Sequence, residues 1–193
     1  MNDTENYLAR LRASRHGRIL YAFLVYLALF GSSFALSYLL FSVIPCGSYM
    51  IACDVSGGGI LNNVKNAVLS QSGCAVILLA VYLSAFSSFS GAVSSAVCLW
   101  RGLCLGCASA LFCKDSVGGL SSSWRVSLCF YLASTVGIIV YASITALYSP
   151  ALTHTSSCGE KRYFRALSAE FTKCFLIASG IVFLLGCASA ILL

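Results

Sequence analysis

The sequence predicts an all-α protein, a polytopic bundle of about five transmembrane helices with its N-terminus inside the cell. Hydrophobic residues make up 59% of the 193 residues and charged residues only 9%, and the mean hydropathy is +0.90. A soluble domain of this length needs more charge to cover its surface. The apolar runs are also long enough to cross a bilayer. We therefore interpret residues 1–193 as a single integral membrane domain.

The first predicted span is 19–44, which carries no charge and is followed by Pro45. It comes after a basic stretch, as the apolar part of a signal peptide does. Its length of about 25 residues exceeds the usual length of that apolar part. We therefore expect it to be retained as a transmembrane helix.

The apolar region 74–113 is too long for one span and suits two of about 20 residues. A weak break, "SSFSG" at 87–91, divides it into spans 74–90 and 91–113. The alternative is one tilted span, 74–100, followed by a re-entrant piece at 102–113, which lowers the total to four spans. The remaining predicted spans are 125–148 and 171–193.

The distribution of basic residues favours five spans, because Lys and Arg near span ends collect on the cytoplasmic side. Five spans put most of the basic residues inside: Arg10, Arg12, Arg15, Arg18, Lys161, Arg162, Arg165 and Lys173. Only Lys65, Lys114 and Arg125 then lie outside. An arrangement of four spans would place nearly equal numbers of these basic residues inside and outside. The C-terminus is accordingly expected outside.

Two connecting segments carry further expectations. In the outer segment 45–73, the apolar spacing from Ile60 to Val68 predicts a short amphipathic helix on the membrane surface, with a plain loop as the alternative. Cys46 and Cys53 of this segment could pair in an oxidising compartment. Segment 149–170 is expected to be a loop that ends in a basic patch at the inner membrane face.

Small residues recur at every fourth position of the third span: Ser90, Ser94, Cys98, Gly102, Gly106 and Ala110. The pentapeptide "GCASA" occurs within it at 106–110 and again at 186–190 in the last span. Such spacing lets two helix backbones approach closely in lipid. Gly106 with Ala110, and Gly186 with Ala190, are therefore candidate helix-packing or partner contacts. A ligand site made from the pentapeptide alone is weakly supported, because small side chains offer few polar groups.

Residues suited to catalysis are scarce. Cys104 and Cys107 have a redox or metal-ligand spacing, but no His lies in a span and no second such pair exists. Cysteine in an apolar helix usually acts as a small packing residue. No catalytic triad, phosphate loop or paired carboxylates occur, and no acidic residue lies in a span core, which argues against a proton-coupled carrier. We expect no enzyme activity, no cofactor, no metal and no nucleic-acid partner.

Arg101 is the exception among the membrane residues, since it lies near the middle of the third span. A charge at the bilayer centre costs at least about 2.5–3.5 kcal/mol on insertion scales. The side chain must either find polar partners inside the bundle or extend to the membrane surface. The sequence leaves both possibilities open.

Two stretches resemble stage II sporulation protein M. The first is "VYLSAFSSFSGAVSSAVCLWRGLCLGCASALF" at 81–112, in which a span turns into a helix carrying Arg101-Gly102 and then Leu105-Gly106; the second is "LNNVKNAVL" at 61–69. Members of that family are mother-cell membrane proteins of endospore formers. They anchor the wall-degrading stage II sporulation proteins D and P during engulfment. The resemblance implies that loops 45–73 and 114–124 are docking surfaces.

The functional expectation is a membrane scaffold or anchor in the cell membrane, in contact with membrane lipid and localising partner proteins. The alternative is a substrate-binding membrane subunit of a vitamin or metabolite importer. A closed pocket with converging polar groups would distinguish this second function.

Overall fold

The protein is an all-α bundle, as predicted. The computed structural model describes residues 15–43, 73–115, 122–159 and 161–192, and these residues contain no strand. They form four long helices: α2 (Arg15–Val43), α4 (Ser90–Asp115), α5 (Ser122–Ser157) and α6 (Lys161–Leu192). A shorter helix, Gly73–Ser84, precedes α4. The predicted amphipathic helix at 60–68 and the possible Cys46–Cys53 pair lie outside the described residues.

Four of these helices are long and apolar enough to cross a membrane: Gly17–Val43, Ser90–Ala110, Cys129–Ser157 and Lys161–Leu185. The Gly73–Ser84 helix rises only about 18 Å at 1.5 Å per residue, against a hydrocarbon core of about 30 Å. It therefore represents only part of the predicted second span. The inside position of the N-terminus and the outside position of the C-terminus remain predictions.

A turn at residues 85–89 separates the Gly73–Ser84 helix from α4. Ser87 holds this turn together, because its backbone N–H donates to the carbonyl of Ser84 at 2.9 Å and its hydroxyl donates to the same carbonyl at 2.8 Å. Serine hydroxyls compete in this way with the regular helical bonds. Since α4 then runs unbroken from Ser90 to Asp115, the alternative of a re-entrant piece at 102–113 is wrong.

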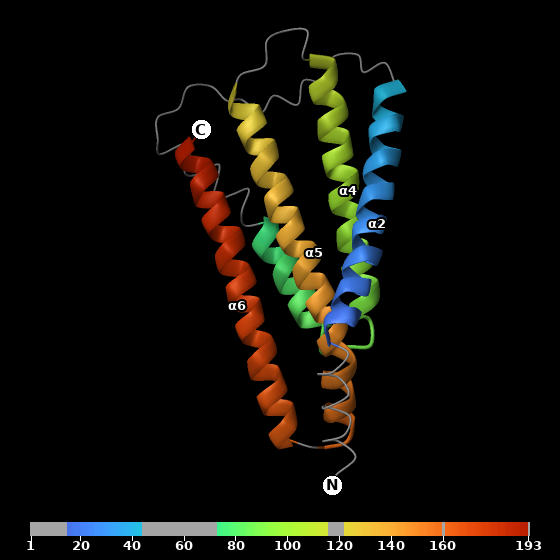
Figure 1. Ribbon diagram of the computed structural model, residues 1–193, viewed down its shortest axis with the longest axis vertical. Coiled ribbons are helices and arrows are strands. Elements are labelled where there is room, and N and C mark those ends of the chain that lie inside the picture. Colours follow the sequence, from blue (N-terminus) through green and yellow to red (C-terminus); the bar gives the residue numbers. More distant parts are fainter. Residues whose placement is uncertain (1–14, 44–72, 116–121, 160, 193) are drawn as a thin grey trace.

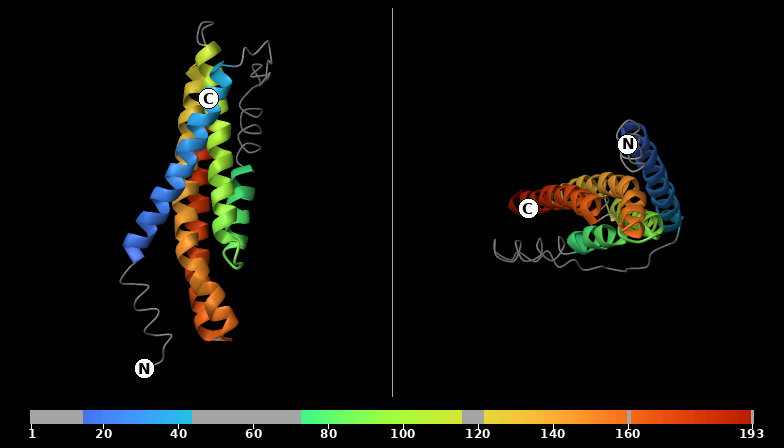
Figure 2. Two further views of the ribbon diagram at one scale, coloured as in Figure 1. Left: turned by 90° about the vertical axis from the view of Figure 1, so that its right-hand side faces the viewer. Right: turned by 90° about the horizontal axis from the view of Figure 1, so that it is seen from below.

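The helices form two pairs. α2 lies beside α4 and runs parallel to it, while α6 lies beside α5 and runs antiparallel (Figures 1 and 2). The Gly73–Ser84 helix packs against α5 and α6 through the buried residues Leu78 and Val81. α5 also contacts both α2 and α4, so it joins the two pairs into one bundle.

The expectation of a loop at 149–170 was wrong. α5 continues to Ser157 with Pro150 inside it, and α6 begins at Lys161. A proline inside a helix removes one backbone hydrogen bond, but the turns after it are held by packing, since Leu152 is fully buried and Ala151 nearly so. The reversal occurs at Gly159, whose φ of 71° is accessible to glycine at little cost. We call residues 150–173 the basal hairpin.

Candidate functional site

Gly102 and Gly106 of α4 lie directly against the backbone of α2. A Cβ atom at Gly102 would come within 2.5 Å of the carbonyl oxygen of Phe30, and one at Gly106 within 3.0 Å of the backbone nitrogen of Tyr38. These atoms belong to the main chain and cannot rotate away. Residue numbers increase in the same direction along both helices at this contact, so α2 and α4 are parallel there. Neither Gly102 nor Gly106 has room for a side chain.

The rest of the small-residue stripe is buried as well, at Ser90, Ser94, Cys98 and Ala110. Ser37 of α2 crosses the interface, since its hydroxyl donates to the carbonyl of Leu103 at 2.8 Å. Such a bond is possible only because glycine at the neighbouring positions brings the two backbones so close.

Arg101 lies about 100° around α4 from Gly102 and is only 4% exposed. Its Nη2 donates to the sulfur of Cys74 at 2.7 Å, and its guanidinium carbon lies 4.7 Å from the centre of the Tyr131 ring. Cys74 comes from the Gly73–Ser84 helix and Tyr131 from α5. The arginine therefore joins three helices and does not extend to the membrane surface.

The charge of Arg101 is only partly compensated within the described residues. An aromatic ring face attracts a cation by about 0.5–2 kcal/mol, and the sulfur accepts one hydrogen bond. The Nε atom is buried without a hydrogen-bond partner in this part of the chain. No described carboxylate supplies a counter-charge to the guanidinium. The guanidinium is a buried charge that links three helices.

The second packing centre of the bundle is Phe171 of α6, which is fully buried. Its ring lies 5.4 Å from that of Tyr82, 5.6 Å from that of Tyr148 and 5.8 Å from that of Tyr141. Phe86 completes the group at 6.2 Å. Tyr82 also shares a 3.0 Å hydrogen bond with Thr172. This aromatic cluster holds the Gly73–Ser84 helix, α5 and α6 together.

Cys104 and Cys107 both lie on α4, and neither forms a disulfide within the described residues. The part of the chain that the structure describes contains no group of three or more His, Cys, Asp or Glu side chains that could hold a metal ion. Cys74 has a polar role, because its sulfur accepts the hydrogen bond from Arg101. Its sequence position gave no sign of this, because its partner Arg101 lies 27 residues away along the chain.

The second copy of the pentapeptide lies near the end of α6. Gly186 and Ala190 fall within the helix Lys161–Leu192, but their surroundings lie outside the described part of the structure. Gly180, earlier on the same helix, has nothing within 4 Å of the point that a Cβ atom would occupy. The contact that the first copy makes with α2 therefore has no described counterpart on α6.

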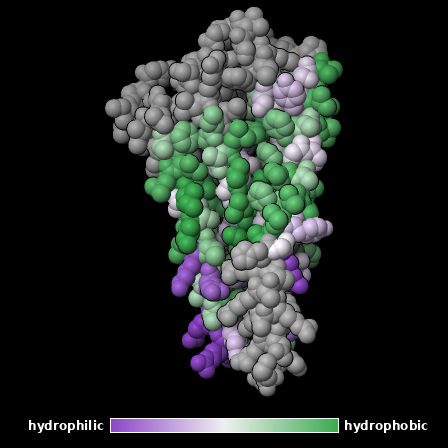
Figure 3. All heavy atoms as spheres, viewed as in Figure 1, coloured by the Kyte–Doolittle hydropathy of each residue, from purple (hydrophilic) through white to green (hydrophobic). Residues whose placement is uncertain are grey.

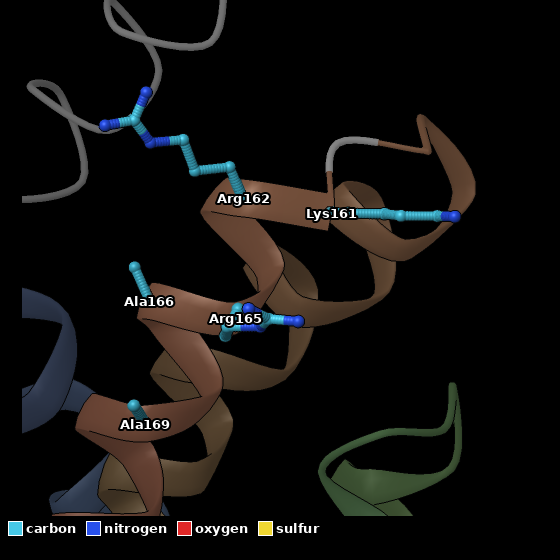
Figure 4. A pocket seen from close by; sticks show the side chains of 5 residues that line it. All are labelled: Lys161, Arg162, Arg165, Ala166 and Ala169. Carbon is cyan, nitrogen blue, oxygen red and sulfur yellow. The ribbon is translucent and has the colours of Figure 1, made fainter.

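The basal hairpin carries charged residues beyond the apolar part of the bundle. Figure 3 shows hydrophilic residues gathered at the lower end of α6, beneath a broad hydrophobic band. Lys161, Arg162 and Arg165 line a surface hollow of about 510 Å³ together with Ala166 and Ala169 (Figure 4). The sequence had identified these cations as a basic patch, but not the helical hairpin that carries them.

The comparisons add no relative: no protein-family model, no curated protein and no solved structure matches this chain.

Proposed function

We propose that this protein is a non-enzymatic membrane scaffold that holds an acidic partner protein on its basal hairpin. The observation that carries the proposal is the reach of that hairpin. α5 is 36 residues long, which corresponds to about 54 Å of helix, whereas the hydrocarbon core of a bilayer is about 30 Å thick. At the hairpin end, α5 and α6 continue past the start of α2 (Figure 1), and we assign part of the excess length to a structured arm there, attached to a membrane anchor.

The arm is rigid because the aromatic cluster supports its base. Phe171 and Tyr148 are buried there, and the Tyr148 hydroxyl donates to a carboxylate oxygen of Glu170 at 3.4 Å. Phe164 packs against Phe86 at a ring distance of 6.3 Å. A rigid arm presents its charges in fixed positions, which lowers the entropy that a partner loses on binding.

The position of the cations favours a protein over lipid headgroups. The uncharged part of α6 begins after Lys173, and Lys161 lies about 18 Å before that point along the helix axis. Attraction to a charged membrane surface decays over about 8–10 Å at physiological salt. Lys161 and Arg162 also point away from each other (Figure 4), so they suit an extended acidic surface better than one small phosphate.

The resemblance to stage II sporulation protein M suggests a more specific form of the same function. In that form the protein lies in the mother-cell membrane and anchors the stage II sporulation proteins D and P. These partners would bind loops 45–73 and 114–124, most of which lies outside the described residues. Recovery of the two wall hydrolases with this protein from engulfing cells would support this form.

The general proposal can be tested by photo-crosslinking in intact cells. A photoreactive residue is placed at Ala166 of the basal hairpin and, as a control, at Leu184, a 67% exposed residue on the apolar part of α6. We expect a discrete protein adduct from position 166 and only lipid adducts from position 184. The combined substitutions Lys161→Glu, Arg162→Glu and Arg165→Glu should remove the protein adduct.

Two results would contradict the scaffold. The first is that the photoreactive residue at position 166 yields only lipid adducts. The second is that the protein adduct remains after the three substitutions to glutamate. The importer alternative requires a closed pocket with converging polar groups. Two hollows on the described residues are surface features, one lined only by α6 and the other mainly by apolar side chains, and neither is a closed pocket of that kind.

A further inference from the structure

A second hollow lies between three helices at the end of the bundle where α2 begins. It measures about 410 Å³. Its walls are one face of α2 at helical spacing, two positions one turn apart on α4, and one turn of α5. These wall residues are Arg18, Tyr21, Ala22, Val25 and Tyr26; Gly91 and Ser95; and Ala146, Leu147 and Pro150. We call this hollow the basal groove.

The basal groove is polar at one end and apolar along its length. α2 and α4 run upward and α5 runs downward (Figure 1), and Arg18 and Gly91 come near the starts of α2 and α4. Arg18 therefore lies at the outer end, at the edge of the uncharged part of α2, and Val25 lies about 10 Å deeper. Arg18 forms no ion pair with any residue in the described part of the chain.

The groove is a fixed feature of the bundle. At its outer end the Ser90 hydroxyl donates to the Ser149 hydroxyl at 2.7 Å, which fixes the start of α4 against α5. Gly91, the next residue, has nothing within 4 Å of the place where a Cβ would be. The space therefore exists because glycine leaves it open and the neighbouring helices cannot close it.

We infer that the basal groove binds one anionic phospholipid, with its phosphate on Arg18 and an acyl chain along the apolar wall. The groove lies in the membrane-crossing part of the bundle, where lipid is the surrounding solvent. A hollow of about 410 Å³ that extends about 10 Å along α2 has room for part of an acyl chain.

The charge at the outer end selects the headgroup. A guanidinium forms paired hydrogen bonds to phosphate oxygens, and the Tyr21 ring, 72% exposed beside it, is of the type that prefers the membrane–water interface. A zwitterionic lipid carries a cation next to its phosphate, which opposes Arg18. The site should therefore prefer phosphatidylglycerol to phosphatidylcholine.

The test is native mass spectrometry of the purified protein in detergent, titrated with dioleoyl phosphatidylglycerol. Gly91→Leu extends into the groove from α4, where a Cβ atom has nothing within 4 Å, and Ala22→Phe fills it from α2. Arg18→Gln removes the charge. The matched controls are Gly31→Leu, an equally open glycine on the outer face of α2, and Arg165→Gln on the basal hairpin. Circular dichroism melting identifies any variant that does not fold.

The parent should retain one phosphatidylglycerol per chain. Arg18→Gln should weaken binding about fivefold, the effect of roughly one membrane-surface cation, and the two groove-filling variants should weaken it at least as much. Both controls should bind like the parent. Unchanged binding by folded Gly91→Leu and Ala22→Phe, equal retention of phosphatidylcholine, or full displacement by inorganic phosphate would overturn the inference. None of these results depends on the scaffold proposal.

Discussion

The two helix pairs of this bundle are packed in opposite ways. α4 meets α2 through residues with almost no side chain, and at Gly102 and Gly106 the backbone of one helix touches the backbone of the other. α6 meets α5 through large rings, with Phe171 enclosed by four other aromatic side chains. Both contacts exclude lipid, but the first does so by bringing the helices together and the second by filling the space between them.

The difference determines which changes each pair tolerates. A close backbone contact has no space to lose and fails when volume is added. An aromatic cluster has few main-chain contacts and fails when volume is removed. Enlarging a side chain should therefore destabilise the α2–α4 contact, whereas truncating a side chain should destabilise the α5–α6 contact.

The largest effect is expected for Phe171→Ala. Truncating a fully buried phenylalanine removes its contacts and leaves a cavity, which typically costs about 3–5 kcal/mol. Thermal unfolding in detergent measures the loss. Phe183→Ala, a 57% exposed position on the same helix, should unfold like the parent. A Phe171→Ala protein as stable as the parent would mean that the aromatic cluster does not hold α6 in place.

Gly106→Leu should be nearly as damaging, at the upper end of the about 1–3 kcal/mol that overpacking costs. The new side chain would meet the backbone of α2 at Phe34 and Tyr38. The readout is again thermal unfolding, with Gly31→Leu as the control, because a Cβ at Gly31 has nothing within 4 Å. Equal stability of the two variants would show that α2 and α4 do not need close approach.

Arg101→Leu tests the charge that lies between the two pairs. Removing an intramembrane charge should leave insertion intact or improve it by up to about 3 kcal/mol, while the links to Cys74 and Tyr131 are lost. We therefore expect normal insertion with reduced partner adduct in the crosslinking assay. Arg101→Lys should keep much of the function, because the charge remains although the forked geometry does not. Full function of Arg101→Leu would make the arginine dispensable.

Gly186→Leu sharpens the comparison by testing whether the second "GCASA" behaves like the first. If Gly186 and Ala190 form a close helix contact, the variant should lose about 1–3 kcal/mol of stability. Gly180→Leu on the same helix is the control, since Gly180 has open space around its Cβ position. No difference between the two would restrict close packing to the first copy.

The smallest effect is expected for Ser37→Ala, which removes the hydroxyl that donates to the Leu103 carbonyl. Hydrogen bonds between membrane helices contribute about 0.6 kcal/mol on average. Ser32→Ala is the matched control, because the Ser32 hydroxyl bonds to a carbonyl of its own helix, that of Leu29. A chemical unfolding series in mixed micelles can resolve a difference of this size. Equal loss in both variants would show that the interhelical bond adds nothing.

The sequence predicted the local features of this protein and missed the long-range ones. The uncharged runs and the turn after Ser84 follow from local composition. The length of each apolar run showed where a span could lie, and the region 74–113 was too long for one span. The extension of α5 past Pro150 could not, because it depends on packing of Leu152 against residues of α6 that come later in the chain. A proline removes a backbone hydrogen bond locally, and nothing in the neighbouring sequence shows the packing that holds the helix together after it.

The candidate residues divide in the same way. The sequence alone determined that α4 carries a stripe without side-chain bulk and one charge in its middle, since both are properties of a single helix in lipid. Only the tertiary structure decided that the stripe meets α2 and that the charge meets Cys74 and Tyr131. It also decided that Arg18 ends a groove between three helices. Small residues permit close approach to any helix, so the choice of partner depends on the shapes of all the helices together.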